Sequence, residues 1–177
     1  MATKSILLSG FGGQGILFAG KFLAYKGLLE EKQVSWLPSY GPEMRGGTAS
    51  CSVIISDSDV GSPIVSKPDI LIAMNLPSLD KFESTVAENG IIIADSTLIS
   101  RKINRTDVKA FYIPATSLAD ENGLKGLANM IIIGKMLSVL EDYNEENINA
   151  ALSKVVPAKK ADMLEFNRKA ISLGANF

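Results

Sequence analysis

Histidine is absent from the 177 residues of this chain, and cysteine occurs only once, at Cys51. Without histidine the chain lacks the commonest general base and the commonest metal ligand. A single cysteine forms no internal disulfide, no cysteine zinc site and no iron–sulfur cluster held by this chain alone. The sequence therefore identifies no catalytic residue and no metal ligand.

Charge of one sign and long hydrophobic runs are also scarce. The formal net charge is −1, which gives no electrostatic case for nucleic acid or an anionic membrane surface. No run of about 18 apolar residues predicts a membrane span. The uncharged start, Ser5 to Gly20, is interrupted by glycines and has no convincing signal-peptidase pattern, so we expect a cytoplasmic protein. A content of 46% hydrophobic and 21% charged residues is typical of one globular domain of this length.

A glycine-rich motif follows the first apolar run of the chain. The run Ser5–Ser9 predicts a strand, and Gly10, Gly12 and Gly15 then have the spacing G-x-G-x-x-G before a helical pattern. Glycine permits a tight turn and lets a ligand approach the backbone, and the following helix directs its free N–H groups at the turn. We expect residues 10–15 to bind an anion, and a tight turn without a ligand remains the alternative. The candidate binding residues here are Gly10, Phe11, Gly12, Gly13, Gln14 and Gly15.

The acidic partner of a dinucleotide fingerprint is missing. A carboxylate about 20 residues further on, at the end of the second strand, normally holds a ribose hydroxyl. Here the second predicted strand, Val34–Leu37, runs into Pro38, and Glu30 and Glu31 precede it. The sequence therefore argues against NAD or FAD bound in the ordinary way.

Strand and helix patterns alternate along the chain, which predicts an α/β fold: a Rossmann-like three-layer sandwich with a mixed, mostly parallel sheet. Only ten residues, 38 to 47, separate the second and third strands, too few for a parallel crossover, so we expect the third strand to be antiparallel. The predicted strands are Ser5–Ser9, Val34–Leu37, Thr48–Ser56, Asp69–Met74, Gly90–Asp95 and Val108–Ile113. The predicted helices are Gln14–Leu29, Pro77–Val86, Gly126–Leu140, Glu145–Val155 and Lys160–Ser172. We expect one domain over residues 1–177, with the helices from about residue 145 packed on it.

A second unusual segment, Ser39–Gly47, joins the second and third strands. It combines an aromatic ring, a carboxylate and a guanidinium with three glycines and a proline, and Arg45 is suited to grip a carboxylate or phosphate. A solvated surface turn is the alternative. Ligands of parallel sheets bind outside the carboxyl ends of the strands, so this segment, the glycine turn, Asn75 and Asp95 should form one rim. The candidate binding residues in the segment are Ser39, Tyr40, Gly41, Arg45, Gly46 and Gly47.

Taken together, the two glycine motifs resemble the gamma subunit, or gamma domain, of the 2-oxoacid:ferredoxin oxidoreductases. The resemblance extends through Val53–Ser56, Ser62–Val65, Pro68–Asn75 and Asn129–Met130 to Gly134. The forms Gly-Phe-Gly-Gly-Gln-Gly and Ser-Tyr-Gly-Pro-Glu are most like the 2-oxoglutarate or branched-chain members.

This resemblance implies a complex that oxidatively decarboxylates a 2-oxoacid to an acyl-coenzyme A and passes electrons to ferredoxin. It implies alpha and beta, and in some complexes delta, partner subunits, which carry thiamine diphosphate and iron–sulfur clusters, with coenzyme A as a substrate. A free dinucleotide-dependent oxidoreductase and a non-catalytic ligand-binding or scaffold domain remain the alternatives.

Three other residues or segments receive structural interpretations. Cys51 shares a strand face with Ala49 and Val53 and is predicted to be a core residue. Asp95 ends a strand and is predicted to cap a helix rather than do chemistry. The segment Met130–Ile133 is apolar nearly all round and predicts a buried helix.

Overall fold

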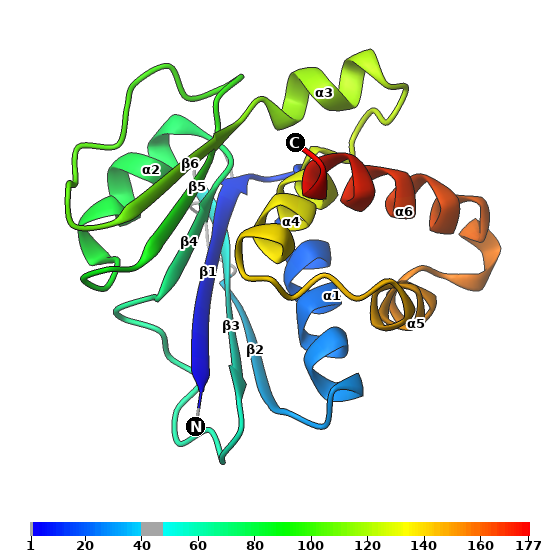
Figure 1. Cartoon of the computed structure of the whole chain (residues 1–177), viewed down its shortest axis with the longest axis horizontal. Coiled ribbons are helices and arrows are strands. Elements are labelled where there is room, and N and C mark those ends of the chain that lie inside the picture. Colours follow the sequence, from blue (N-terminus) through cyan, green and yellow to red (C-terminus); the bar gives the residue numbers. More distant parts are fainter. Residues whose placement is uncertain (1, 40–47) are drawn as a thin grey trace.

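The computed structural model describes residues 2–39 and 48–177, which form a six-stranded sheet with helices on both faces (Figure 1). The strands are β1 (Thr3–Phe11), β2 (Gln33–Ser39), β3 (Thr48–Ser56), β4 (Ile70–Ala73), β5 (Ile91–Asp95) and β6 (Lys109–Ile113). The helices are α1 (Ile16–Leu29), α2 (Leu76–Phe82), α3 (Ala115–Glu121), α4 (Ala128–Val139), α5 (Glu145–Val155) and α6 (Asp162–Ala175), and short 3₁₀ turns cover Glu83–Thr85 and Ala158–Lys160.

The sheet has the strand order β2-β3-β1-β4-β5-β6 and is mixed, as predicted. β4 is parallel to β1, and β5 and β6 continue in the same direction. β3 is antiparallel to both of its neighbours, β1 and β2. The antiparallel direction of the third strand, predicted from its short connection to the second strand, is therefore confirmed.

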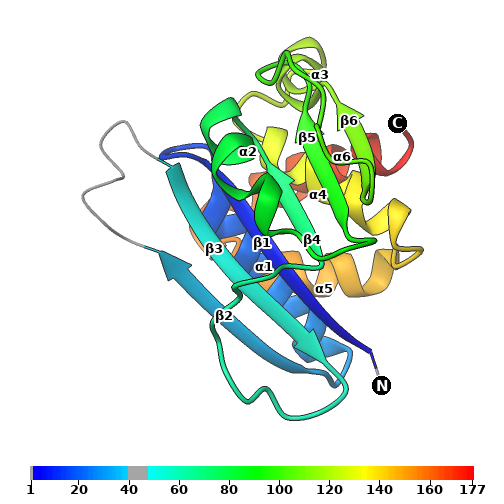
Figure 2. The same ribbon diagram turned by 90° about the vertical axis from the view of Figure 1, so that its left-hand side faces the viewer.

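Helices cover the two faces of the sheet unequally. A large apolar core lies under α1, α4, α5 and α6, and a smaller one, around Leu71 and Leu79, lies under α2. Figure 2 shows α2 in front of β4, whereas β2 and β3 carry no helix on that face. The predicted three-layer sandwich is confirmed, with its thicker layer on the α1 side.

Glycines let α1 pack closely against β3 and let α4 pack closely against α6. A Cβ atom at Gly20 of α1 would meet the sulfur of Cys51, so α1 lies close against β3. Between α4 and α6, a Cβ at Gly134 would overlap the carbonyl of Ile171, and one at Gly174 would overlap the carbonyl of Ile131. The α4–α6 contact is therefore made by main chain at these two points.

Five of the six helices occur where the sequence predicts them, and α3 is the one that it missed. Its seven residues follow Pro114, and the N–H of Thr116 in its first turn donates to Asp95, 21 residues earlier in the sequence, at 3.2 Å. The predicted buried helix at Met130–Ile133 is confirmed, since all four of its residues are fully buried.

Candidate functional site at the carboxyl edge of the sheet

The glycine turn connects the end of β1 to the start of α1. Phe11 ends the strand, and the N–H of Gln14 donates to the carbonyl of Phe11 at 3.2 Å, which closes a tight turn. Gly13 and Gly15 have φ values of 90° and 73°, in the left-handed region that favours glycine. The predicted strand–turn–helix context of the glycine motif is therefore present.

The side chain of Gln14 holds this turn against the neighbouring strand. Its Oε1 accepts from the N–H of Phe11 at 2.6 Å, and its Nε2 donates to the carbonyl of Met74 at 3.2 Å. A Cβ at Gly10 would lie 2.5 Å from this Oε1 and 3.1 Å from the Cβ of Met74. Gly10 thus leaves the room that Gln14 occupies, and Gln14 has a bracing role that the glycine spacing alone does not reveal.

The first turn of α1 has no side-chain cap. Gly15 occupies the N-cap position, where serine or asparagine would accept from the helix N–H groups, and the structure shows no such bond there. The side chain that does touch Gly15 comes from α4: Nδ2 of Asn129 donates to the carbonyl of Gly15 at 3.0 Å. That bond fixes the turn while leaving the amide end of the helix to other partners.

The two segments singled out in the sequence begin at the same edge of the sheet. Gly10 pairs with Ala49 and Ser39 pairs with Ser50, so the ends of β1 and β2 and the start of β3 meet there. Ser39 is the first residue of the second segment, and Thr48 directly follows its last. The candidate residues Tyr40, Gly41, Arg45, Gly46 and Gly47 lie outside the described residues.

Asn75 and Asp95 also lie at this edge, and both cap backbone N–H groups. Oδ1 of Asn75 accepts from the N–H of Ser78 at 2.8 Å, at the start of α2. Asp95 accepts from the N–H of Thr97 at 3.0 Å and from the hydroxyl of Thr116 at 2.6 Å. Capping by Asp95 is thus as predicted, although the helix that it serves, α3, follows the next strand.

One buried donor at this edge has no partner in the part of the chain that the structure describes. It is Nδ2 of Asn75, whose residue is 1% exposed. A buried donor left unpaired is costly, so it favours an acceptor from outside these residues.

The geometry also explains why a ribose carboxylate is missing. β3 separates β1 from β2, so the end of β2 is not beside β1 as in a dinucleotide fold. Glu30, one of the two acidic residues before β2, instead accepts from Lys26 at 2.5 Å and from Asn147 at 3.0 Å. Its carboxylate belongs to a structural network under α1 and α5.

Cys51 is a core residue, as the strand pattern predicts. It is 1% exposed, and its thiol donates to the carbonyl of Ile16 at 3.5 Å. Burial raises the pKa of this thiol to about 12, so it stays protonated near neutral pH. A protonated, buried thiol is a poor nucleophile and a poor metal ligand.

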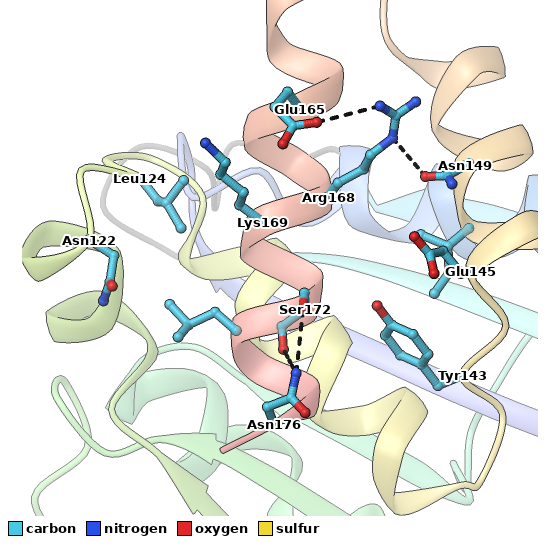
Figure 3. Close-up of a pocket in the computed structure, with 12 residues that line it drawn as sticks. Asn122, Leu124, Tyr143, Glu145, Asn149, Glu165, Arg168, Lys169, Ser172 and Asn176 are labelled. Atoms are coloured by element: carbon cyan, nitrogen blue, oxygen red, sulfur yellow. Dashed lines mark hydrogen bonds and ion pairs between the residues drawn. The ribbon is translucent and has the colours of Figure 1, made fainter.

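The larger of two notable cavities lies away from the glycine turn, between α5, α6 and the end of α3 (Figure 3). It has a volume of about 770 Å³, and none of the described candidate residues lines it. Arg168 in its wall donates to Asn149 at 2.7 Å and pairs with Glu165 at 3.5 Å. Its only arginine is thus already paired within the wall, so this cavity does not extend the candidate site.

Across residues 2–39 and 48–177, no group of histidine, cysteine and acidic side chains is placed to hold a metal ion. Within the same ranges, no helix has the length and apolar character needed to cross a membrane.

Comparison with known proteins defines the class. The chain belongs to the family described as pyruvate ferredoxin/flavodoxin oxidoreductase, whose family model matches residues 5–177. It is 41% identical over 173 residues to ketoisovalerate oxidoreductase subunit VorA of Methanothermobacter thermautotrophicus, covering 97% of this chain and 36% of that protein. The chain thus spans about a third of the length of that relative.

Relatives of about the same length as this chain also exist. The 2-oxoglutarate synthase subunit KorC of Methanocaldococcus jannaschii is 35% identical over 170 residues, which is 93% of this chain and 91% of that protein. A crystal structure of a keto/oxoacid ferredoxin oxidoreductase gamma subunit from Geobacter sulfurreducens superposes with a TM-score of 0.83 at 29% identity, over 98% of this chain and 96% of that one. The family assigned from the two glycine motifs is confirmed.

Proposed function

We propose that this protein is the gamma subunit of a cytoplasmic 2-oxoacid:ferredoxin oxidoreductase, acting on 2-oxoglutarate or a branched-chain 2-oxoacid. The complex would convert the 2-oxoacid and coenzyme A to an acyl-coenzyme A and carbon dioxide, passing two electrons to ferredoxin. The observation that carries this proposal is the family match over residues 5–177, together with relatives whose names specify ketoisovalerate and 2-oxoglutarate.

Within such a complex the redox groups would belong to partner subunits. One buried cysteine with a raised thiol pKa and no histidine do not fit an iron–sulfur cluster, which needs several thiolate ligands. We assign thiamine diphosphate and the clusters to alpha, beta or delta partners. The single domain of 177 residues, with α5 on α1 and α6 on α4, would act by binding and positioning.

The glycine turn is proposed to bind an anionic group, with coenzyme A phosphate as the natural candidate. A helix N-terminus without a side-chain cap leaves N–H groups and the positive end of the helix dipole for such a group. Gly12 is exposed in this turn, so a side chain there would meet the ligand before it disturbs the core. Gly12→Val should therefore raise the coenzyme A requirement of the assembled complex without unfolding the subunit.

The segment Ser39–Gly47 is proposed to contact the catalytic subunits close to thiamine diphosphate. Ser39 and Thr48 place its two ends at the same sheet edge as the glycine turn, and tyrosine and arginine are enriched among residues that dominate interface energetics. Arg45 would pair with a carboxylate or phosphate. Losing one member of a desolvated charge pair costs about 2–5 kcal/mol, so Arg45→Ala should weaken assembly or coenzyme A use by more than about tenfold.

Reconstitution tests the proposal directly. The purified chain should be inactive alone with 2-oxoacid, coenzyme A and a viologen dye, and turnover should appear only when alpha and beta partners are added. Turnover by the single chain, or an assembled complex that works equally well without it, would refute the proposed role. Tight calorimetric binding of NAD would instead revive a dehydrogenase function.

A further inference from the structure

The chain contains two asparagine–glycine steps, Asn89-Gly90 and Asn122-Gly123. Such a step has a reaction of its own, in which the backbone nitrogen of the glycine attacks the side-chain carbon Cγ of the asparagine and expels ammonia. The resulting succinimide ring is opened by water, which yields aspartate or isoaspartate. Glycine favours this reaction because it has no side chain to hinder the approach. The structure surrounds the two steps differently, so their reactivity should differ.

The first step is fixed by neighbouring main chain. The N–H of Gly90 donates to the carbonyl of Ala87 at 2.9 Å, and the carbonyl of Gly90 accepts from the N–H of Lys109 at 2.8 Å. Gly90 is buried, and a Cβ atom there would lie 2.7 Å from the carbonyl oxygen of Ala87. The N–H of Asn89 is also held, by the carbonyl of Asp107 at 2.8 Å. Ring closure at this step therefore requires the chain before β5 to separate from β6.

The second step lies at the exposed end of α3, beside the cavity of about 770 Å³ (Figure 3). Asn122 and Gly123 are both exposed, and among the described residues no atom beyond the chain neighbours lies within 4 Å of a Cβ position at Gly123. The N–H of Gly123 donates to the carbonyl of Asp120 over a long 3.4 Å. Nδ2 of Asn122 donates to the carbonyl of Leu118 at 2.8 Å. The restraints on this step thus come from a single helical turn.

The rotation that ring closure needs is therefore less costly at Asn122 than at Asn89. The ψ angle of Asn122 is 10°, which directs the nitrogen of Gly123 away from Cγ, so the main chain must turn between the two residues. Exposed helix ends fray at a small part of the free energy that opens a strand of the core. The buried Leu124, whose N–H donates to the carbonyl of Ala119 at 2.8 Å, confines this movement to the last turn of α3.

We propose that Asn122 is a site of spontaneous deamidation, in which the nitrogen of Gly123 closes the ring, ammonia leaves and water supplies the new carboxylate. The product adds negative charge at the C-terminus of α3, beside Asp120 and Glu121, where the helix dipole disfavours it. It also removes the Nδ2 donor that holds the carbonyl of Leu118. Deamidation therefore loosens the last turn of α3, a helix that the proposed function does not use.

Peptide mapping of the complete 177-residue chain tests the proposal, because trypsin places each asparagine of interest in a peptide with no other asparagine. These peptides are Ala110–Lys125 with Asn122, Phe82–Arg101 with Asn89 and Ala170–Phe177 with Asn176. Asn176 is the matched control for sequence. It too ends a helix and donates through Nδ2 to a carbonyl four residues earlier, at 2.8 Å, but phenylalanine follows it instead of glycine.

The folded chain is incubated at mildly alkaline pH and digested at intervals, and mass spectrometry follows the gain of one mass unit that accompanies the loss of an amide. Asn122 should convert at least about tenfold faster than Asn89, because the two sites open at different free energies. Asn176 should stay unchanged. In urea, where the fold no longer separates them, Asn89 and Asn122 should convert at similar rates.

The substitution Asn122→Asp tests the consequence for α3. It should speed amide hydrogen exchange in the last turn of α3 at least about threefold, because a hydrogen bond is lost and a charge opposes the helix dipole. Asn176→Asp makes the same change at the end of α6 and should leave exchange in α3 unchanged.

Three results would overturn the proposal: equal rates at Asn89 and Asn122 in the folded chain, conversion of Asn122 only in urea, or conversion of Asn176 as fast as that of Asn122. The mapping needs no variant, so it stands even if Asn122→Asp fails to fold. It also needs no partner subunit, so its outcome is independent of the oxidoreductase assignment.

Discussion

Two strand-to-helix turns lie on adjacent parallel strands, and they satisfy the first turn of their helices in different ways. After β4, the side chain of Asn75 caps the N–H of Ser78, and Pro77 in the first turn of α2 has no N–H to satisfy. After β1, Gly15 has no side chain that could act as a cap. Two amide side chains contact this turn, but Gln14 accepts from the N–H of Phe11 and Asn129 donates to the carbonyl of Gly15. The helix start of the β4–α2 turn is capped within the protein, whereas the β1–α1 turn is braced but keeps its helix end available.

This difference separates a structural turn from a turn of the same topology that we propose to bind a ligand. Glycines and hydrogen bonds to the backbone maintain the conformation of the β1–α1 turn, without a side chain that caps the N–H groups of the helix. Substitutions in the β1–α1 turn should therefore affect both its conformation and ligand binding, and those in the β4–α2 turn should affect stability alone.

The largest effect is expected at Gly15. Gly15→Ala forces a side chain into the left-handed region, at about 1–2 kcal/mol, and its Cβ would overlap Nδ2 of Asn129, at about 1–3 kcal/mol more. Urea unfolding should show a loss of about 3 kcal/mol. Gly13→Ala is the matched control, because Gly13 has φ 90° but no atom within 4 Å of its Cβ position, so only the backbone cost applies. Equal losses in the two variants would contradict this account of Asn129.

A smaller loss is expected from Gln14→Leu. The variant removes two hydrogen bonds that join the turn to the end of β4, at about 1 kcal/mol each. Chemical unfolding should show a loss of about 2 kcal/mol, and the assembled complex should need more coenzyme A. Gln14→Glu keeps the acceptor for Phe11 but places negative charge at the helix N-terminus. The glutamate variant should therefore be more stable than the leucine variant while still weakening the binding of an anion at the turn. Normal coenzyme A kinetics in both variants would count against an anion site.

At the capped turn, Asn75→Ala should lower the free energy of unfolding by about 1 kcal/mol, the usual cost of losing an N-cap. Coenzyme A kinetics of the assembled complex should stay unchanged, as expected for a purely structural turn. A large kinetic effect would instead assign the unpaired Nδ2 of Asn75 to the ligand.

The smallest effect near neutral pH concerns Cys51, which lies beneath the first turn of α1. At pH 8 the folded protein should not react with Ellman's reagent, because its buried thiol has a pKa of about 12. Above pH 9 the unfolded thiol ionises while the folded one keeps its proton, so stability should fall as the pH rises from about 9 to 12. Cys51→Ala should flatten that dependence, and rapid labelling at pH 8 would show that the turn opens.

Local patterns in the sequence predicted most of the fold. Strand β3 and helix α5 have the bounds expected from their patterns, and the direction of β3 followed from a ten-residue connection. The polar bracing was not predicted, because Gln14 to Met74 and Asn129 to Gly15 are contacts 60 and 114 residues apart. Helix α3 was missed for the same reason.

The burial of Asn129 and Asn167 was hidden from sequence reasoning in a similar way. Asn129 stood out only as part of the family resemblance, although a lone polar residue in an apolar helix is a usable signal for a buried contact. Asn167 lies among polar residues of α6, and nothing local marks it as buried. The packing of α6 on α4 contributes to the burial of both.

The glycine pair between α4 and α6 has a consequence for how this protein can diverge. Gly134 and Gly174 bring the two helices together through main-chain contact, so this contact does not depend on the side chains that line the cavity of about 590 Å³ beside them. Residues such as Lys160 and Met163 are then open to replacement by drift or selection while the helix stays where it is. The lining of that cavity can change over evolutionary time with its frame preserved, whereas either glycine can accept a side chain only by separating the helices.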